Sequence, residues 1–218
     1  MASFNVQSTY YLLFLLFTLG LAPFLAVLVT SYIKLVVVLS LVRNALGTQQ
    51  VPSNLVINGL AIILSLYIMS PVINEVLVIV NEENVSLEDF DSVARAFSKG
   101  KEPFRDFLRR HAHEEERSFF TQSAHTLWSE ERVNNMREDD FLVLIPAFTV
   151  SELTEAFRIG FLVYLPFLAI DLVISNILLA MGMMMVSPMM ISLPFKLLLF
   201  VALNGWGRLV HSLILTYQ

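Results

Sequence analysis

Hydrophobic residues in this chain are gathered into four long stretches. They cover, approximately, residues 10–42, 55–80, 141–185 and 191–217. A helix needs roughly 20 apolar residues to cross the hydrocarbon core of a bilayer, and each stretch is long enough. Backbone polar groups in lipid must be hydrogen-bonded within the protein, so these stretches are expected to be helical. The pattern therefore predicts an all-α membrane protein with four nominal hydrophobic helical segments.

Prolines interrupt this apolar pattern. Pro23, Pro71, Pro146 and Pro166 lie inside the stretches or at their ends. Proline removes a backbone donor and kinks or ends a helix. The third stretch is also longer than one crossing requires. It is therefore predicted to be a broken helix or two packed helices, and the fold is expected to contain proline-broken helices.

A hydrophilic segment separates the second stretch from the third. Within residues 81–140, Phe104, Phe107 and Leu108 follow helical spacing. The segment is interpreted as a small helical domain with acidic, solvated faces. Three parts are thus expected: a first helical hairpin over 1–80, the hydrophilic helical domain over 81–140, and broken-helix hairpins over 141–218.

Composition and charge support the membrane class. Of the 218 residues, 56% are hydrophobic and 15% are charged, against about 25% charged in a typical soluble domain. Residues 81–140 hold 15 of the 19 acidic and nine of the 14 basic side chains, so this segment carries the net negative charge. No basic stripe indicates nucleic acid as a partner. The absence of cysteine excludes disulfides and thiolate chemistry.

Basic residues near short loops predict the orientation in the membrane. Lys34 and Arg43 are taken to mark the first turn, and Lys196 follows a methionine-rich run. Such residues favour the cytoplasmic side. The amino terminus and the hydrophilic domain are then expected on the outer, periplasmic side. The first ten residues carry no basic region, and no small-residue cleavage site follows, so the first stretch is expected to be a retained membrane segment.

Three charged residues lie close together in the third apolar stretch. At about 100° per residue, Glu152, Glu155 and Arg158 fall within roughly 120° of one another on a helix. Charge facing lipid at a helix centre costs several kcal/mol. These side chains are therefore predicted to be buried polar groups or contacts with another subunit.

Candidate catalytic and metal-binding residues are few. His111, His113 and Glu114–Glu116 lack the spacing of a zinc-binding helix and are interpreted as a polar helix face. Glu152 and Asp171 are the one carboxylate pair that an intramembrane hydrolase could use. That enzyme class and a small-solute transporter remain the alternatives to a structural role. No cofactor or metal is expected.

Six of the nine methionines lie between Met181 and Met190. Methionine is flexible and polarizable, so such a run can fill irregular gaps in a core. A ring of the same side chains could instead form a deformable apolar seal that excludes water. Gly182 and Pro188 indicate a turn within the run. Both interpretations stay open on this evidence.

Two charges bracket the methionine run symmetrically. The midpoint between Asp171 and Lys196 falls between Met183 and Met184. A helical hairpin with its apex there would place both charges at similar depth, about 18 Å from the tip. An acid and a base at equal depth can neutralise each other. The spacing therefore predicts an ion pair between Asp171 and Lys196, within one chain or between copies.

Several longer motifs resemble a known family. They are Val42-Arg-Asn-Ala-Leu-Gly-Thr-Gln-Gln-Val-Pro-Ser-Asn54, Pro146-Ala-Phe-Thr-Val-Ser-Glu-Leu-Thr-Glu-Ala-Phe-Arg-Ile-Gly-Phe161, Leu165-Pro-Phe, Asp171-Leu-Val-Ile-Ser, Met181-Gly-Met-Met-Met, Ser192-Leu-Pro-Phe-Lys196 and Gly205-Trp206. Together they resemble the FliP/SctR family of type III secretion. The residues from Gln49 to Ser53 resemble its injectisome form more than its flagellar form. The hydrophilic segment shows no such resemblance.

The resemblance implies a structural, pore-forming subunit of the export gate in the bacterial inner membrane, with no enzymatic activity. Five copies would assemble with the R/T-type and Q/S-type export proteins into a closed portal for secreted polypeptides, bordered by membrane lipid. Further partners would be the autoprotease switch protein and the large export-gate subunit. Met183, Met184 and Met185 would be the gasket, and a cytoplasmic loop would contain Arg43, Asn44 and Gly47.

Overall fold

Helices make up nearly all of the chain that the structure describes. The structure is a computed structural model, and it describes residues 17, 20, 24, 27–48, 50–82, 90–133, 137 and 139–218. Its helices are α2 (Tyr32–Leu46), α3 (Asn54–Glu82), α4 (Phe90–Gly100), α5 (Glu102–His111), α6 (Glu114–Leu127), α7 (Glu130–Val133), α8 (Phe141–Ala180), α9 (Pro188–Ala202) and α10 (Gly205–Leu215). The described residues contain no strand, as the sequence predicted. Most of the first apolar stretch before residue 27 lies outside them.

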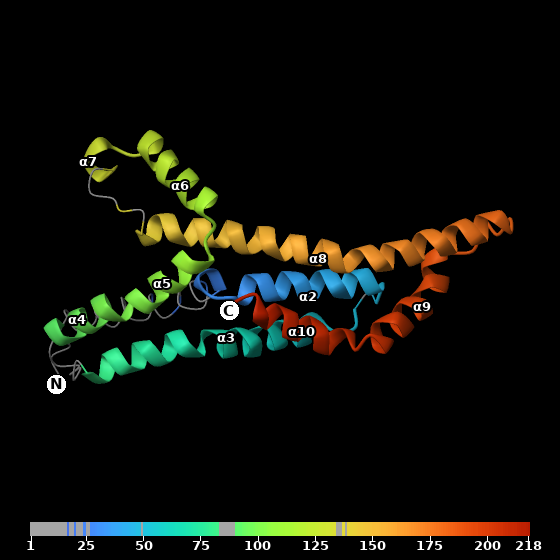
Figure 1. Ribbon diagram of the computed structural model, residues 1–218, viewed down its shortest axis with the longest axis horizontal. Helices are drawn as coiled ribbons and strands as arrows, with labels where there is room; N and C mark the ends of the chain where they lie inside the picture. The colour runs from blue at the N-terminus through green and yellow to red at the C-terminus, as the bar shows by residue number, and fades with distance from the viewer. Residues whose placement is uncertain are drawn as a thin grey trace, which may run out of the picture.

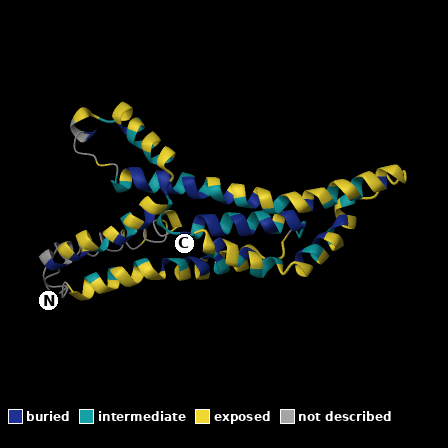
Figure 2. Cartoon of the chain, viewed as in Figure 1, coloured by how far each residue is buried: buried dark blue, intermediate teal, exposed yellow. Residues whose placement is uncertain are grey.

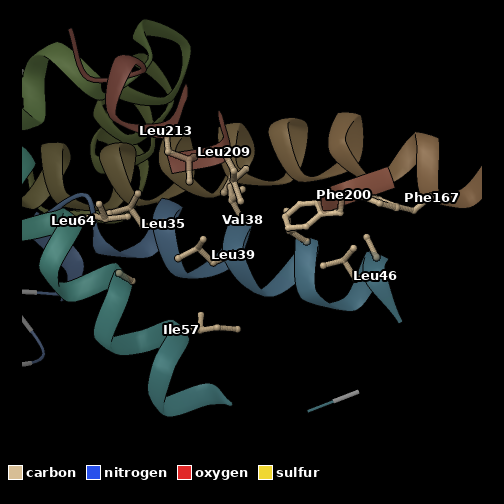
Figure 3. Close-up of a cluster of buried hydrophobic side chains, with 14 residues drawn as sticks. Leu35, Val38, Leu39, Leu46, Ile57, Leu64, Phe167, Phe200, Leu209 and Leu213 are labelled. Carbon is tan, nitrogen blue, oxygen red and sulfur yellow. The ribbon is translucent and has the colours of Figure 1, made fainter. Parts of the chain in front are cut away.

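The short helix α2 lies at the centre of the bundle. It runs beside α8, with α3 and α10 on its other side (Figure 1). Leu35, Val38 and Leu39 are completely buried. They belong to one buried cluster with Leu64 of α3 and Phe200 of α9, and Figure 3 shows Leu35 beside Leu64. Its apolar residues therefore contact other helices of the same chain, and α2 is a core element.

Four membrane spans were predicted, and the described residues provide fewer. Two helices are long and apolar enough to cross a membrane, namely α3 and α8. The pair α9 and α10 would make a third span only if both are counted as one, and they are bent by 60° relative to each other. The later part of the first stretch forms the 15-residue α2, which by itself is too short to span a bilayer.

The predicted break in the third stretch is wrong. Helix α8 continues for 40 residues through Pro146 and Pro166, and α3 continues through Pro71. A proline removes one helical hydrogen bond and costs about 3 kcal/mol. Packing offsets that cost, because α2 and α5 lie against α8 and bury Val143, Leu144 and Phe148 among others. In an apolar setting, continuing the helix also keeps the remaining backbone groups hydrogen-bonded.

The break between α9 and α10 occurs where the backbone adopts left-handed geometry. Asn204, between α9 and α10, has a φ of 50°. The chain also reverses between α8 and α9, at the methionine run.

Glycine permits the close approach of α2 to α8: a Cβ at Gly160 would lie 2.3 Å from Leu41 Cδ1 and 3.2 Å from its Cβ.

The helices of the hydrophilic segment pack on the apolar ones. Phe107 and Leu108 of α5 are buried in a second cluster with Met69 of α3 and Phe148 of α8. The helical spacing predicted for this part of the segment is thus present. Figure 2 shows α6 largely exposed where it projects from α8. The division of the chain into three domains stays a prediction.

Candidate functional site: the methionine turn and the buried charges

The methionine run forms the tight turn between α8 and α9. Gly182 adopts a φ of 74°, a left-handed conformation that glycine permits without steric cost. The Gly182 N–H donates to Leu179 O at 3.0 Å, and the Met183 N–H donates to Leu178 O at 2.9 Å. These two bonds form the motif that commonly ends a helix at a glycine. Pro188 then begins α9, where its missing N–H costs nothing.

The side chains of this turn are exposed at the tip of a projecting hairpin. Met184 is 82% exposed and Met185 is fully exposed, while Met183 is about half exposed. In Figure 2 the tip of the hairpin, where α8 turns into α9, is coloured as exposed. These methionines therefore fill no gap in the core of their own chain. Their side chains are accessible at the tip of the hairpin.

An ion pair fixes the base of the methionine hairpin. Lys196 Nζ lies 2.6 Å from Asp171 Oδ2, and the Ser192 hydroxyl donates to Asp171 Oδ1 at 2.6 Å. Lys196 Nζ also donates to Ala45 O at 3.1 Å, near the end of α2. The structure thus brings together the two charges that the sequence paired. It adds a contact to α2, which anchors the hairpin to the central helix.

Removing the acid of this pair should cost more than removing the base. In an Asp171→Asn variant the buried Lys196 ammonium loses its counter-ion, which we expect to cost about 3–5 kcal/mol of unfolding free energy. Lys196→Met should cost less, because Asp171 is 28% exposed and keeps its bond from Ser192. Exchanging the two residues should restore the ion pair and with it part of the lost stability. The rescue should be incomplete, because a carboxylate at position 196 would face the Ala45 carbonyl oxygen. Denaturant unfolding in detergent measures all three; an exchange no more stable than Asp171→Asn contradicts the pairing.

A second buried charge network joins α2, α8 and the carboxyl end of the chain. Lys34 Nζ lies 2.8 Å from Glu152 Oε1, and both side chains are at most 5% exposed. The Tyr217 hydroxyl donates to Glu152 Oε2. Lys34 Nζ lies 4.1 Å from the centre of the Tyr217 ring. Sequence reasoning predicted that Glu152 is buried but missed Lys34 and Tyr217, which lie 118 and 65 positions away along the chain.

None of the three basic residues used to predict orientation is a loop residue, since even Arg43 lies in the last turn of α2. Lys34 lies inside α2, and Lys196 lies inside α9. Both are buried and paired with acids. Placing Lys34 at the first turn was therefore wrong. The rule concerns bases flanking membrane segments, so these two residues supply no evidence on orientation.

Glu155 and Arg158 differ from Glu152 in their surroundings. Glu155 Oε1 lies 3.4 Å from Arg158 NH1 and 3.8 Å from His113 Nε2. Arg158 is 73% exposed, so it is not buried in the chain as predicted. Arg158 therefore lies on the exposed side of α8. Its contact with another subunit stays a prediction.

His111 packs beside the second network and should make the fold sensitive to acid. Its ring centre lies 4.7 Å from that of Phe107 and 5.1 Å from that of Tyr217. Burial, followed by the positive charges of Lys34 and Arg110, lowers the pKa of His111 to about 4. The unfolded chain binds this proton at its ordinary pKa of about 6.5. The contribution of neutral His111 to the free energy of unfolding is thus fully present above pH 6.5. It is lost progressively as the pH falls toward 4.

Unfolding of the purified chain in detergent between pH 7 and pH 4 measures this effect. A His111→Phe variant keeps an aromatic ring in place and should lose this part of the pH dependence. If the stability of that variant depends on pH as strongly as that of the original chain, His111 is not the cause of the acid sensitivity.

The arrangement does not favour hydrolysis. Glu152 and Asp171 lie 19 residues apart on one helix, about 28 Å at a rise of roughly 1.5 Å per residue. Each is paired with its own lysine. The Ser151 hydroxyl donates to Ala147 O and accepts from the His113 backbone N–H. Among the described residues no cluster of acids and histidines could hold a metal ion.

Arg43 and Asn44 were predicted to lie in the loop after the first apolar stretch, but both belong to the last turn of α2, and only Gly47 follows it. Arg43 nevertheless orders the loop between α2 and α3. Arg43 NH1 donates to Asn54 Oδ1 at 2.6 Å and to Pro52 O at 3.2 Å. Gly47 ends α2 with a φ of 76°, and its N–H donates to Asn44 O. These contacts hold the loop against the first turn of α3. Its placement on the cytoplasmic side stays a prediction.

Comparison with known proteins places this architecture in a family. The FliP family pattern matches residues 15–213. The chain is 55% identical over 206 residues to Yop proteins translocation protein R of Yersinia pestis, covering 94% of this chain and 95% of that protein. It is 49% identical over 204 residues to virulence protein YscR of Salmonella typhimurium, covering 94% of each. It is 48% identical to hypersensitivity response secretion protein HrcR of Ralstonia nicotianae, covering 92% and 93%. These matches confirm the resemblance seen in the sequence motifs, and the chain belongs to the FliP family.

Proposed function

We propose that this chain is a structural, pore-forming subunit of a type III secretion export gate in the bacterial inner membrane. Its relatives are named as translocation, virulence and hypersensitivity-response secretion proteins. Two helices with the length and hydropathy of membrane spans support an inner-membrane location. The single observation that carries the gate role is the exposed methionine turn at the tip of an anchored hairpin.

The methionine turns of several copies would form the seal. One turn is too small to close a path, and its side chains contact nothing that would bury them in one chain. Brought together around an axis, the turns would form an apolar constriction that excludes water. Because methionine is flexible, the same ring would yield to an unfolded polypeptide without requiring one shape.

The outer faces of α3 and α8 support assembly with other subunits. Their large exposed apolar side chains include Leu66 and Tyr67 on α3 and Phe157, Phe161 and Leu162 on α8. Exposed apolar surface of this extent marks contact with protein or membrane. Five copies, joined by the R/T-type and Q/S-type export proteins, would cover these faces. The autoprotease switch protein, the large export-gate subunit and the lipid would border the assembly.

Purification from a cell that co-expresses the R/T-type and Q/S-type partners tests this function. In mild detergent we expect one complex, many times heavier than the 24.7-kDa chain, with five copies of it by native mass spectrometry. A strain lacking the chain should secrete no substrate. A lone monomer, or secretion that continues without the chain, would overturn the proposal.

A further inference from the structure

Among the described residues, the thioethers of the methionine turn are the most accessible soft nucleophiles. No cysteine is present to react before them. We propose that this turn is a site of reversible sulfoxidation, and that oxidation there makes the closed gate leak. The modification site follows from exposure and chemistry alone. Its consequence for the gate rests on the proposed function.

Exposure separates the methionines at the tip of the turn from the one described methionine in the core. Met184 and Met185 project into open space, whereas Met69 of α3 is 2% exposed within the second core cluster. The turn backbone keeps the methionines at the tip accessible: the Met184 N–H donates to Gly182 O at 3.0 Å, and the Val186 N–H donates to Met183 O at 3.3 Å. An ordered turn of this kind cannot fold its side chains back into the core. The ring proposed above would still leave the thioethers facing the path.

The reaction needs a two-electron oxidant from outside the protein, of the peroxide or hypohalous acid class. The sulfur lone pair attacks one oxygen of hydrogen peroxide and the O–O bond breaks. The proton on the transferred oxygen passes to the departing hydroxide, so a sulfoxide and water form. Sulfur loses two electrons, and the peroxide gains them. A methionine sulfoxide reductase reverses the step.

Oxidation changes the physical character of the seal. A thioether is apolar and deformable, whereas a sulfoxide carries a strong S–O dipole and accepts hydrogen bonds from water. A constriction that closes by excluding water needs an apolar lining. Several sulfoxides around one ring would let water enter, and ions would follow. Leucine has a similar volume and no sulfur, so a Met183→Leu, Met184→Leu, Met185→Leu variant would keep the seal but lose its sensitivity.

The first arm of the test locates the modification. The assembled complex is treated with hydrogen peroxide, and peptides are quantified by mass spectrometry over time. Sulfoxide at Met184 and Met185 should form at least about tenfold faster than at Met69, in keeping with the dependence of oxidation on accessibility. Equal rates at the turn and at Met69 would overturn the site.

The second arm measures the consequence. The complex is reconstituted in liposomes, and ion conductance is recorded before peroxide, after peroxide, and after added reductase. Conductance should rise and then return, and the leucine variant should show no change. If the turn is oxidised while conductance stays constant, the proposed consequence is wrong. The seal itself is tested by glycine at the same three positions. If the glycine variant also leaves conductance unchanged, the proposed function is wrong as well.

Discussion

Replacing Met183, Met184 and Met185 together by glycine is expected to raise the ion conductance of the closed assembly by at least about an order of magnitude, because the substitution removes the apolar side chains that exclude water. The three side chains make little contact with their own chain, and Met185 makes essentially none. Folding and assembly should therefore survive the change. Conductance of the reconstituted complex, or uptake of small molecules by cells that produce it, measures the leak.

Leucine at the same positions is the matched control. It keeps volume and apolarity and changes shape only modestly, so the leak should be much smaller than with glycine. A second control removes Met69, which lies in the core and should affect stability without affecting conductance. A glycine variant that assembles fully and does not leak would count against the seal.

Replacing Glu152 by alanine is expected to lower the free energy of unfolding by about 3–5 kcal/mol, because the Lys34 ammonium would remain buried without a counter-ion. The variant also leaves the Tyr217 hydroxyl without its acceptor. Since the network joins α2, α8 and the carboxyl end, the loss should loosen all three together. Chemical unfolding of the purified chain in detergent measures the change.

Two variants separate the charge effect from simple loss of contact. Glu155→Ala removes the neighbouring acid one turn along α8, whose partner Arg158 is exposed, and should cost under about 1 kcal/mol. A Lys34→Met, Glu152→Leu double variant removes both buried charges and should be far more stable than Glu152→Ala. A double variant as unstable as the single one would show that the penalty does not arise from the unpaired lysine.

The ion pairs show which parts of this site the sequence could predict. Asp171 and Lys196 flank one turn, so their distances from its apex were enough to pair them. Lys34 and Glu152 are separated by more than a hundred residues along the chain. No feature of the sequence around either residue specifies which residues of the two helices face each other. That contact depends on the packing of α2 against α8, where Gly160 lets the two helices approach.

The helix boundaries show a similar division. Gly182 and Pro188 predicted the methionine turn, because left-handed geometry and a proline at the first helical position are local preferences. Pro146 and Pro166 suggested breaks that do not occur, because tertiary packing decides whether a proline-containing helix continues. The apolar residues of α2 were taken for part of a membrane span, since apolar composition alone does not distinguish a lipid-facing helix from a central one.

If the methionine turns of several copies meet at one axis, cysteine cross-linking at the turn should detect it most directly. Because the chain has no cysteine, a Met184→Cys variant carries a single reporter. Leu55→Cys on α3 is the matched control, since Leu55 and Met184 are both 82% exposed. A short thiol cross-linker applied to the closed, assembled complex should join copies through position 184 and not through position 55. Cross-linking at position 184 no greater than at position 55 would contradict a shared seal.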